Sequence, residues 1–150
     1  MLGAGVLIGW LMAESRSNES GDSTSGTLQS PDSRRIEVGR SVYQANCAQC
    51  HGANAEGQPL WQQRNSDGSL KPPPHDETGH TWHHSDGLLF RIIRDGGQIY
   101  ETSGFKSGMP AFGGRLTPED IKGVIAYFKS LRGPEERSFQ EELNQGDPFP

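Results

Sequence analysis

The sequence has few hydrophobic residues, few cysteines and no concentration of positive charge. Hydrophobic residues make up 31% of the 150 positions. The long Val, Ile and Leu runs of a buried parallel sheet are missing, which excludes a large α/β enzyme. Only two cysteines are present, three residues apart, so several disulfides cannot hold the fold. The net charge is −5, and no basic patch indicates nucleic-acid binding.

Turn-forming residues are abundant instead. Glycine (20) and proline (10) together are 30 of 150 residues, or 20%, against roughly 12% in average proteins. Such a chain forms many turns and has little apolar material for a core. Either the folded part is small, or a non-protein group fills its centre.

The first 33 residues divide into two segments. Residues 1–13 are an unbroken apolar run, shorter than the roughly 17–25 residues of a membrane span but matching the core of a signal peptide. No Lys or Arg precedes the run, and Leu11 occupies a position where a cleavage site needs a small residue. Three interpretations remain open: a signal whose gene product starts further upstream, a short uncleaved anchor, and a buried helix. Residues 14–33 hold seven serines and one large apolar residue, Leu28, which predicts a disordered tether.

Residues 34–133 are predicted to form the folded domain, with three main helices. The first runs through Tyr43 into Cys47, and the second begins after Ser85 and stops at Gly96. The third begins after Thr117, and its apolar residues recur at helical spacing: Ile121, Val124, Ile125, Phe128 and Leu131. Long loops are predicted between them, and no alternating strand pattern is found. The fold class is therefore all-α, and residues 134–150 are predicted to be a loose acidic C-terminal tail.

The segment Cys47-Ala48-Gln49-Cys50-His51 is the attachment sequence of a c-type haem. Residues three apart lie on the same side of a helical turn, so both thiols can bond the vinyl groups of one haem. The adjacent His51 then ligates the iron. A thioredoxin-like pair is the first alternative, but it needs a βαβ context that is missing here. A zinc site is the second, and it could use only Cys47, Cys50, His51 and one remote histidine.

Met109 is the leading candidate for the sixth iron ligand. It lies in the loop before the third helix, and Pro110 biases its backbone to an extended conformation. A thioether is a soft, neutral ligand, and a Met/His pair raises the haem potential. The alternative is that Met109 fills a gap in the core.

These residues resemble the class I monohaem cytochromes c. The resemblance covers about residues 34–133 and rests on Gly39, Tyr43, the Cys47–His51 motif, Gly108-Met109-Pro110 and Ala126-Tyr127-Phe128. It implies the cytochrome c fold, wrapped around one covalently attached haem c. It also implies that Gly39 and Tyr43 meet Val124, Tyr127 and Phe128 where the first and last helices cross. The family transfers electrons without a substrate-binding catalytic site, and in bacteria its haem is attached outside the cytoplasm.

The stretch from Trp61 to His84 departs from the plainest family pattern. It contains Trp61, Arg64, Trp82 and the histidines at positions 75, 80, 83 and 84, and it resembles a bacterial subgroup with a Gly-His-Thr-Trp-His-His segment. A second metal site or a bis-histidine haem would explain the histidines. The preferred interpretation is a loop closing over the haem edge, in which Trp61, Arg64 and Trp82 donate hydrogen bonds to the propionates.

The predicted function is one-electron transfer, without enzymatic activity, between redox partner proteins. The predicted location is the periplasm or another extracytoplasmic space, with residues 1–13 as a possible tether to the inner membrane. Two alternatives stay open. One is a haem-based small-molecule-binding protein or enzyme with a labile sixth iron position. The other is an electron-entry subunit of a membrane redox complex.

Overall fold

The computed structural model describes residues 30–99 and 104–150, and their regular structure is helical. Within these ranges, the only β-sheet pairing consists of two isolated β-bridges, from Leu70 to Arg64 and from Leu70 to Ser107. The all-α prediction is therefore confirmed. Residues 1–13 and most of the predicted tether lie outside the described residues. The elements are α1 (Pro31–Asn46), α2 (Ala48–His51), a 3-10 turn η1 (Thr81–His83), α3 (Asp86–Asp95), α4 (Pro118–Ser130) and α5 (Pro134–Asn144).

Helix α1 begins earlier than the predicted domain start at Arg34. The Ser30 hydroxyl oxygen accepts a hydrogen bond from the Ser33 backbone N–H at 3.1 Å, and a proline occupies the first turn. The last residues assigned to the tether are therefore helical. Serine is typical both of disordered segments and of helix N-caps, so the serine-rich composition of residues 14–33 did not distinguish the N-cap Ser30 from the tether.

The predicted starts of α3 and α4 are confirmed. The Ser85 side chain accepts from the Leu88 N–H at 3.1 Å, and Gly96 ends α3. Thr117 and Asp120 form a reciprocal capping box at the start of α4. These caps fix where the two helices begin, and the loops before them carry the residues of the candidate site.

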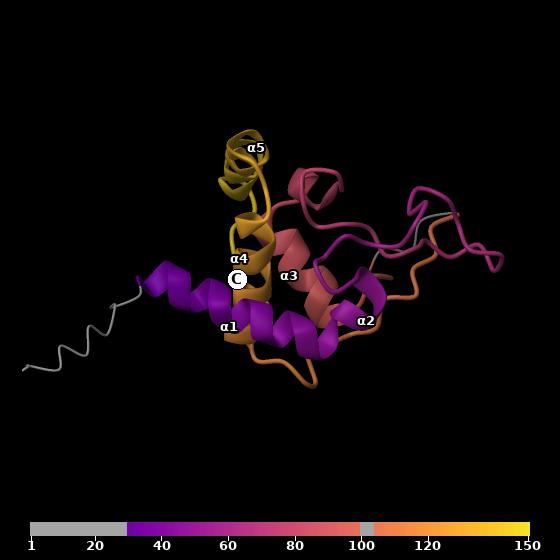
Figure 1. The fold of residues 1–150 in the computed structure, drawn as a ribbon, viewed down its shortest axis with the longest axis horizontal. Coiled ribbons are helices and arrows are strands. Elements are labelled where there is room, and N and C mark those ends of the chain that lie inside the picture. Colours follow the sequence, from indigo (N-terminus) through magenta and orange to yellow (C-terminus); the bar gives the residue numbers. More distant parts are fainter. Residues whose placement is uncertain (1–29, 100–103) are drawn as a thin grey trace, which may run out of the picture.

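The first and fourth helices cross with their backbones in contact (Figure 1). A Cβ atom added to Gly39 would lie 1.9 Å from the carbonyl oxygen of Gly123, so no side chain fits at that point. Beside the crossing, the ring of Tyr43 lies 5.3 Å from that of Tyr127 and 5.8 Å from that of Phe128. The predicted packing of the first helix on the last is confirmed.

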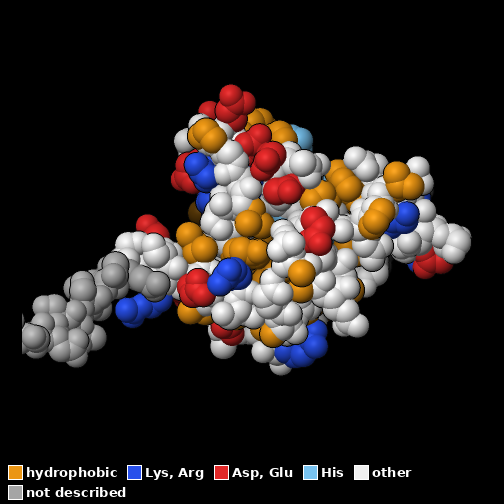
Figure 2. Space-filling model, in the orientation of Figure 1, with side chains coloured by type: hydrophobic (Ala, Val, Ile, Leu, Met, Phe, Trp, Pro, Cys, Tyr) orange, Lys and Arg blue, Asp and Glu red, His pale blue; other side chains and the backbone are white. Residues whose placement is uncertain are grey.

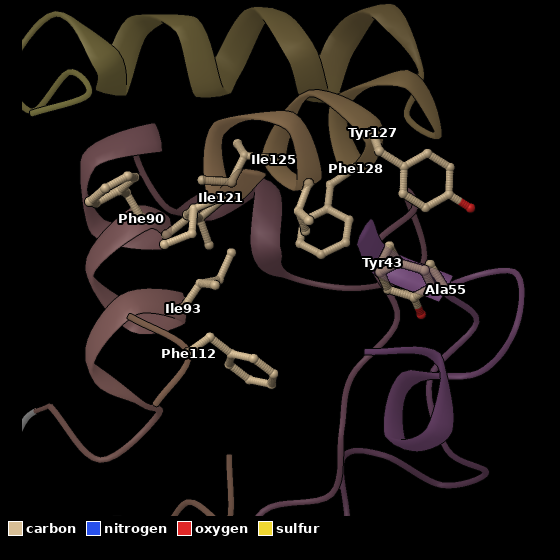
Figure 3. Close-up of a cluster of buried hydrophobic side chains, with 11 residues drawn as sticks. Tyr43, Ala55, Phe90, Ile93, Phe112, Ile121, Ile125, Tyr127 and Phe128 are labelled. Atoms are coloured by element: carbon tan, nitrogen blue, oxygen red, sulfur yellow. The ribbon is translucent and has the colours of Figure 1, made fainter. Parts of the chain in front are cut away.

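The hydrophobic core lies where α1, α3 and α4 meet. Figure 3 shows Ile121 and Ile125 of α4 directed toward Phe90 and Ile93 of α3, with Phe112 entering from the loop before α4. Tyr43 and Ala55 close the other end of this cluster. The core is small, in agreement with the low hydrophobic content. In the described part of the chain, no helix is long and apolar enough to cross a bilayer.

The prediction of a loose C-terminal tail is wrong. Residues 134–144 form α5, and Gln140 on this helix is completely buried. The segment docks on the N-terminus of α3: the Asp86 N–H donates to Asn144 at 2.7 Å, and Arg91 forms a bidentate pair with Asp147. Polar side chains make much of this attachment, and Phe139 and Phe149 add ring contacts with Trp82 and Phe90. The acidic residues of α5 remain on the surface at this end of the molecule (Figure 2).

Candidate functional site

The Cys47–His51 motif lies at the junction of α1 and α2. The backbone N–H groups of Cys50 and His51 both donate to the carbonyl of Cys47 at 3.0 Å, which forms one tight helical turn. Both thiols are free; Cys47 is half-buried and Cys50 is exposed. Burial, reinforced by the nearby Cys50, raises the pKa of Cys47 to about 11. The pair is thus two free thiols on one turn, without a disulfide between them.

The imidazole of His51 is held in one tautomer. Its Nδ1 lies 3.0 Å from the carbonyl oxygen of Pro73. A carbonyl oxygen only accepts, so Nδ1 carries the proton and Nε2 keeps its lone pair. Burial lowers the pKa of His51, which favours the neutral ring. This is the state in which a histidine ligates a metal.

The chain after His51 is fastened back to α1. The Tyr43 hydroxyl donates to the carbonyl of Gly52 at 2.6 Å, and burial raises the pKa of this phenol. Gly52 has a φ of +84°, and Ala55, which is fully buried, has a φ of +62°. A left-handed alanine is uncommon and costs energy. The surrounding contacts therefore stabilise this turn in a conformation that is unfavourable on its own. The turn fixes the backbone directly after His51.

Met109 is half-buried and packs against the same core cluster as Cys47. Its N–H donates to the Ser107 hydroxyl at 3.2 Å, and its carbonyl accepts from the Gly97 N–H at 3.0 Å. These bonds, with Pro110, fix the backbone at Met109. The role of Met109 as an iron ligand stays a prediction.

The three predicted propionate donors have different environments. The N–H of Trp82 donates to the Gly79 carbonyl at 3.0 Å, and its role as a propionate donor stays a prediction. Arg64 is exposed and uses one N–H on the Gly68 carbonyl at 2.8 Å. Trp61 lies flat on the ring of His80, at 5.4 Å and 12°. The roles of Arg64 and Trp61 stay predictions.

Sequence reasoning missed the position of His75. This side chain is buried, and its ring stacks on that of His51 with centroids 4.5 Å apart. Burial holds the pKa of His75 well below its usual range. Among the described residues, the buried Nδ1 atoms of His75 and His80 have no hydrogen-bond partner. Proline neighbours in the sequence, Pro73 and Pro74, were the only signal that this histidine is held in place.

The other histidines of the loop lie further along it. His84 meets His80 edge to face at 5.3 Å, and His83 is exposed beside Trp82. Within residues 30–99 and 104–150, no group of three or more His, Cys, Asp or Glu side chains is arranged to hold a metal ion.

A buried arginine behind this loop was also missed. The guanidinium of Arg132 donates to the carbonyl of His75 at 3.1 Å, to the Thr81 hydroxyl at 2.9 Å and to the Gln140 side chain. All three acceptors are uncharged, and burial lowers the pKa of Arg132 to about 10. Arg132 therefore connects the histidine-rich loop to α5.

The donor set fits a c-type haem. Two free thiols share a helical turn with a neutral imidazole whose Nε2 is available, and a thioether lies on a separate, fixed loop. The thin protein core and the long loops around the motif agree with a large apolar group at this place.

Comparison with known proteins gives the same result. Residues 34–128 match the family described as cytochrome C oxidase, cbb3-type, subunit III. The FixP subunit of the cbb3-type cytochrome c oxidase from Sinorhizobium medicae is 38% identical over 96 residues, which are 64% of this chain and 30% of FixP. Cytochrome c6 from Bryopsis maxima is 32% identical over 97 residues, which are 64% of this chain and 92% of cytochrome c6.

Among solved structures, cytochrome cL from Methylophaga aminisulfidivorans is 22% identical, with a TM-score of 0.48, over 80% of this chain and 73% of that protein. The chain spans about 30% of the length of the cbb3 oxidase subunits it matches, but nearly all of cytochrome c6. The family match covers the helices and loops that carry the Cys47–His51 motif. The chain is therefore a member of the cytochrome c family, and its all-α architecture is the cytochrome c fold.

Proposed function

We propose that this protein is a one-electron carrier, not an enzyme, and that it holds one haem c through thioethers from Cys47 and Cys50. In this proposal His51 and Met109 would bind the iron. The observation that carries it is the hydrogen bond from His51 to Pro73, on the same helical turn as two free thiols. When bound, the haem supplies a reversible ferric/ferrous couple.

The chain's own residues set the properties of that couple. The Pro73 carbonyl makes the His51 imidazole more basic by accepting its Nδ1 proton, which strengthens it as a donor. A thioether ligand from Met109 would favour ferrous iron and raise the potential. Hydrogen bonds hold the backbone at Gly52 and at Met109, which would limit the rearrangement that accompanies electron transfer.

A second candidate is an electron-entry module of a membrane oxidase. The similarity to FixP and CcoP, which are named as subunits of cbb3-type oxidases, supports it. The same chemistry would then serve a fixed partner instead of a diffusing one. In either case we propose an extracytoplasmic location, with redox proteins as partners and residues 1–13 as a signal or membrane tether.

Optical spectra of the purified holoprotein test the carrier proposal. We expect a low-spin spectrum in both redox states, a sulfur-to-iron charge-transfer band in the oxidised protein and no change when CO is added to the reduced protein. Ready CO binding by the native protein would instead support a small-molecule-binding haem protein with a labile sixth position. Haem staining of a denaturing gel tests covalent attachment, and the Cys47→Ala, Cys50→Ala double variant should lose the stain.

The two assemblies are separated by kinetics. The reduced protein is mixed with a purified cbb3-type oxidase, and its oxidation is followed at several ionic strengths. A freely diffusing carrier turns over many times per oxidase. A fixed subunit instead copurifies with the oxidase in one-to-one amounts.

A further inference from the structure

Three planar rings stack beside the motif. The ring of His75 lies 4.5 Å from that of His51, at 29°, and 3.8 Å from that of Phe128, at 16°. Phe128 belongs to α4 and to the hydrophobic core, and Tyr43 meets His75 edge to face at 6.4 Å. The His75 ring therefore lies between the hydrophobic core and the His51 ring and contacts both.

The backbone of His75 is fixed on both sides. Its N–H donates to the carbonyl of Ala55 at 2.9 Å, and its carbonyl accepts from Arg132 at 3.1 Å. Arg132 is itself buried and tied to Thr81 and Gln140. A ring held by such a frame does not rotate freely.

The segment Pro73–His75 thus contacts His51 twice. The Pro73 carbonyl determines where the Nδ1–H of His51 points, but a single hydrogen bond leaves the ring free to pivot about the N–H···O direction. A flat neighbour at stacking distance removes this remaining freedom. We propose that His75 is a positioning residue, which sets the rotational orientation of the His51 ring when His51 ligates iron. This inference rests on the proposed function for the ligand role of His51.

The orientation of an axial imidazole has an electronic consequence. Its π orbital overlaps one of two perpendicular iron d orbitals, so the ring angle determines where the unpaired spin of ferric iron lies on the macrocycle. The haem methyl resonances in proton NMR and the g-values in electron paramagnetic resonance report this distribution. Neither readout responds to a general loss of stability.

The test compares His75→Ala with His75→Phe in the oxidised, full-length holoprotein. His75→Phe keeps a flat ring and should retain the native order of haem methyl resonances. His75→Ala removes the flat neighbour and should reorder or broaden these resonances and shift the g-values. If His75→Ala fails to retain haem, His75→Leu, which keeps bulk without flatness, gives the same comparison with the same expected result.

A matched control separates orientation from stability. Phe90→Ala creates a cavity at the far end of the core, away from Tyr43 (Figure 3). It should lower the melting temperature and leave the resonances in their native order. Native resonances and g-values in His75→Ala would overturn the positioning role, as would equal changes in His75→Ala and His75→Phe. Wild-type protein without covalent haem would overturn the proposed function itself, which is a different result from either of these.

Discussion

At the residue scale, the candidate site depends on how His51 is held. The Pro73 carbonyl fixes its tautomer, and the stacked ring of His75 covers one of its faces. Neither contact is adjacent in sequence, yet both come from one short segment that begins with consecutive prolines. Proline fixes its own backbone angle, so this segment loses little entropy when it is held against His51.

Met109 provides the first prediction at this scale. Met109→Ala should abolish the sulfur-to-iron charge-transfer band and allow CO to bind reduced iron, because no thioether then occupies the sixth position. Met109→His should keep six-coordination and lower the reduction potential, because imidazole donates more strongly than thioether and stabilises ferric iron. Optical spectroscopy and redox titration measure both effects.

The loop histidines serve as controls for this assignment. His80→Ala and His84→Ala should leave the charge-transfer band intact. The band's disappearance in either variant, with its retention in Met109→Ala, would show that a histidine is the sixth ligand.

At the element scale, the α1–α4 crossing gives a sharp steric prediction. In a helix interior, alanine is intrinsically more favourable than glycine by about 1 kcal/mol. In Gly39→Ala, however, the new Cβ would lie 1.9 Å from a backbone oxygen of Gly123, and backbone atoms cannot move aside cheaply. We expect Gly39→Ala to lower the free energy of unfolding by about 3 kcal/mol.

Gly114→Ala is the matched control for the crossing, since no atom of the described residues lies within 4 Å of the Cβ it would add. Its unfolding free energy should change by less than about 0.5 kcal/mol. Urea titration of both holoproteins measures the difference. Equal stability of the two variants would mean that the helices do not meet at Gly39.

Helix α5 is the second element with a testable contribution. The fully buried Gln140 accepts from Arg132 and donates to the His84 carbonyl at 2.9 Å and to Asp86 at 3.1 Å. Gln140→Ala leaves the Arg132 guanidinium without one of its acceptors in a buried place. We expect a loss of about 3 kcal/mol in unfolding free energy.

Gln145→Ala, at the exposed end of the same helix, is the control and should be close to neutral. Chemical denaturation followed by circular dichroism gives both values. A neutral Gln140→Ala would show that α5 does not stabilise the domain through this bond.

The comparison of α4 with α5 explains how far the sequence predicts the fold. Helix α4 has a capping box and an apolar face, which are local signals, and its start was predicted correctly. Helix α5 has no side-chain cap, and its buried Gln140 and its Asn144 bind residues outside the helix, Arg132 and Asp86. The fold brings together Arg132, Asp86 and Gln140, which are separated in the sequence. No local sequence pattern therefore predicts their hydrogen bonds. The stack of His75 on His51 was unpredictable for the same reason.

At the scale of the whole molecule, charge is unevenly distributed. The surface over α5 is acidic (Figure 2), although the domain before it, residues 34–133, carries a small excess of positive charge. In the interior, burial favours the neutral form of the loop histidines. Because these histidines bind protons more readily in the unfolded chain, stability depends on pH.

We predict that the protein becomes less stable as the pH falls from about 7.5 to about 5.5. Burial lowers the pKa values of His75, His80 and His84 in the folded state, whereas in the unfolded chain histidine titrates near 6.5. Below pH 6.5 the unfolded state therefore binds more protons than the folded state, and the free energy of unfolding decreases. Urea titration at both pH values measures the effect.

The double variant His80→Gln, His84→Gln should show a smaller pH dependence over this range. Asp147 titrates in a separate, more acidic range, because hydrogen bonds from Arg91 and Ser85 lower its pKa to about 2. Its contribution is lost only as the pH falls below about 4. An unchanged slope in the histidine double variant would contradict the assignment of the pH effect to this loop.

The contact between Gly39 and Gly123 also bears on how the chain can change during evolution. Most of the site, including the loops around His75 and Met109, lies between these two glycines, so their contact closes one long loop. The entropy of closing a loop grows only slowly with its length, by about 0.6 kcal/mol for each doubling. Insertions and deletions around residues 57–71 therefore change the free energy of closing this loop at the α1–α4 crossing very little. The fold can acquire new loops beside the Cys47–His51 motif, and with them new partners, while the two glycines stay where they are.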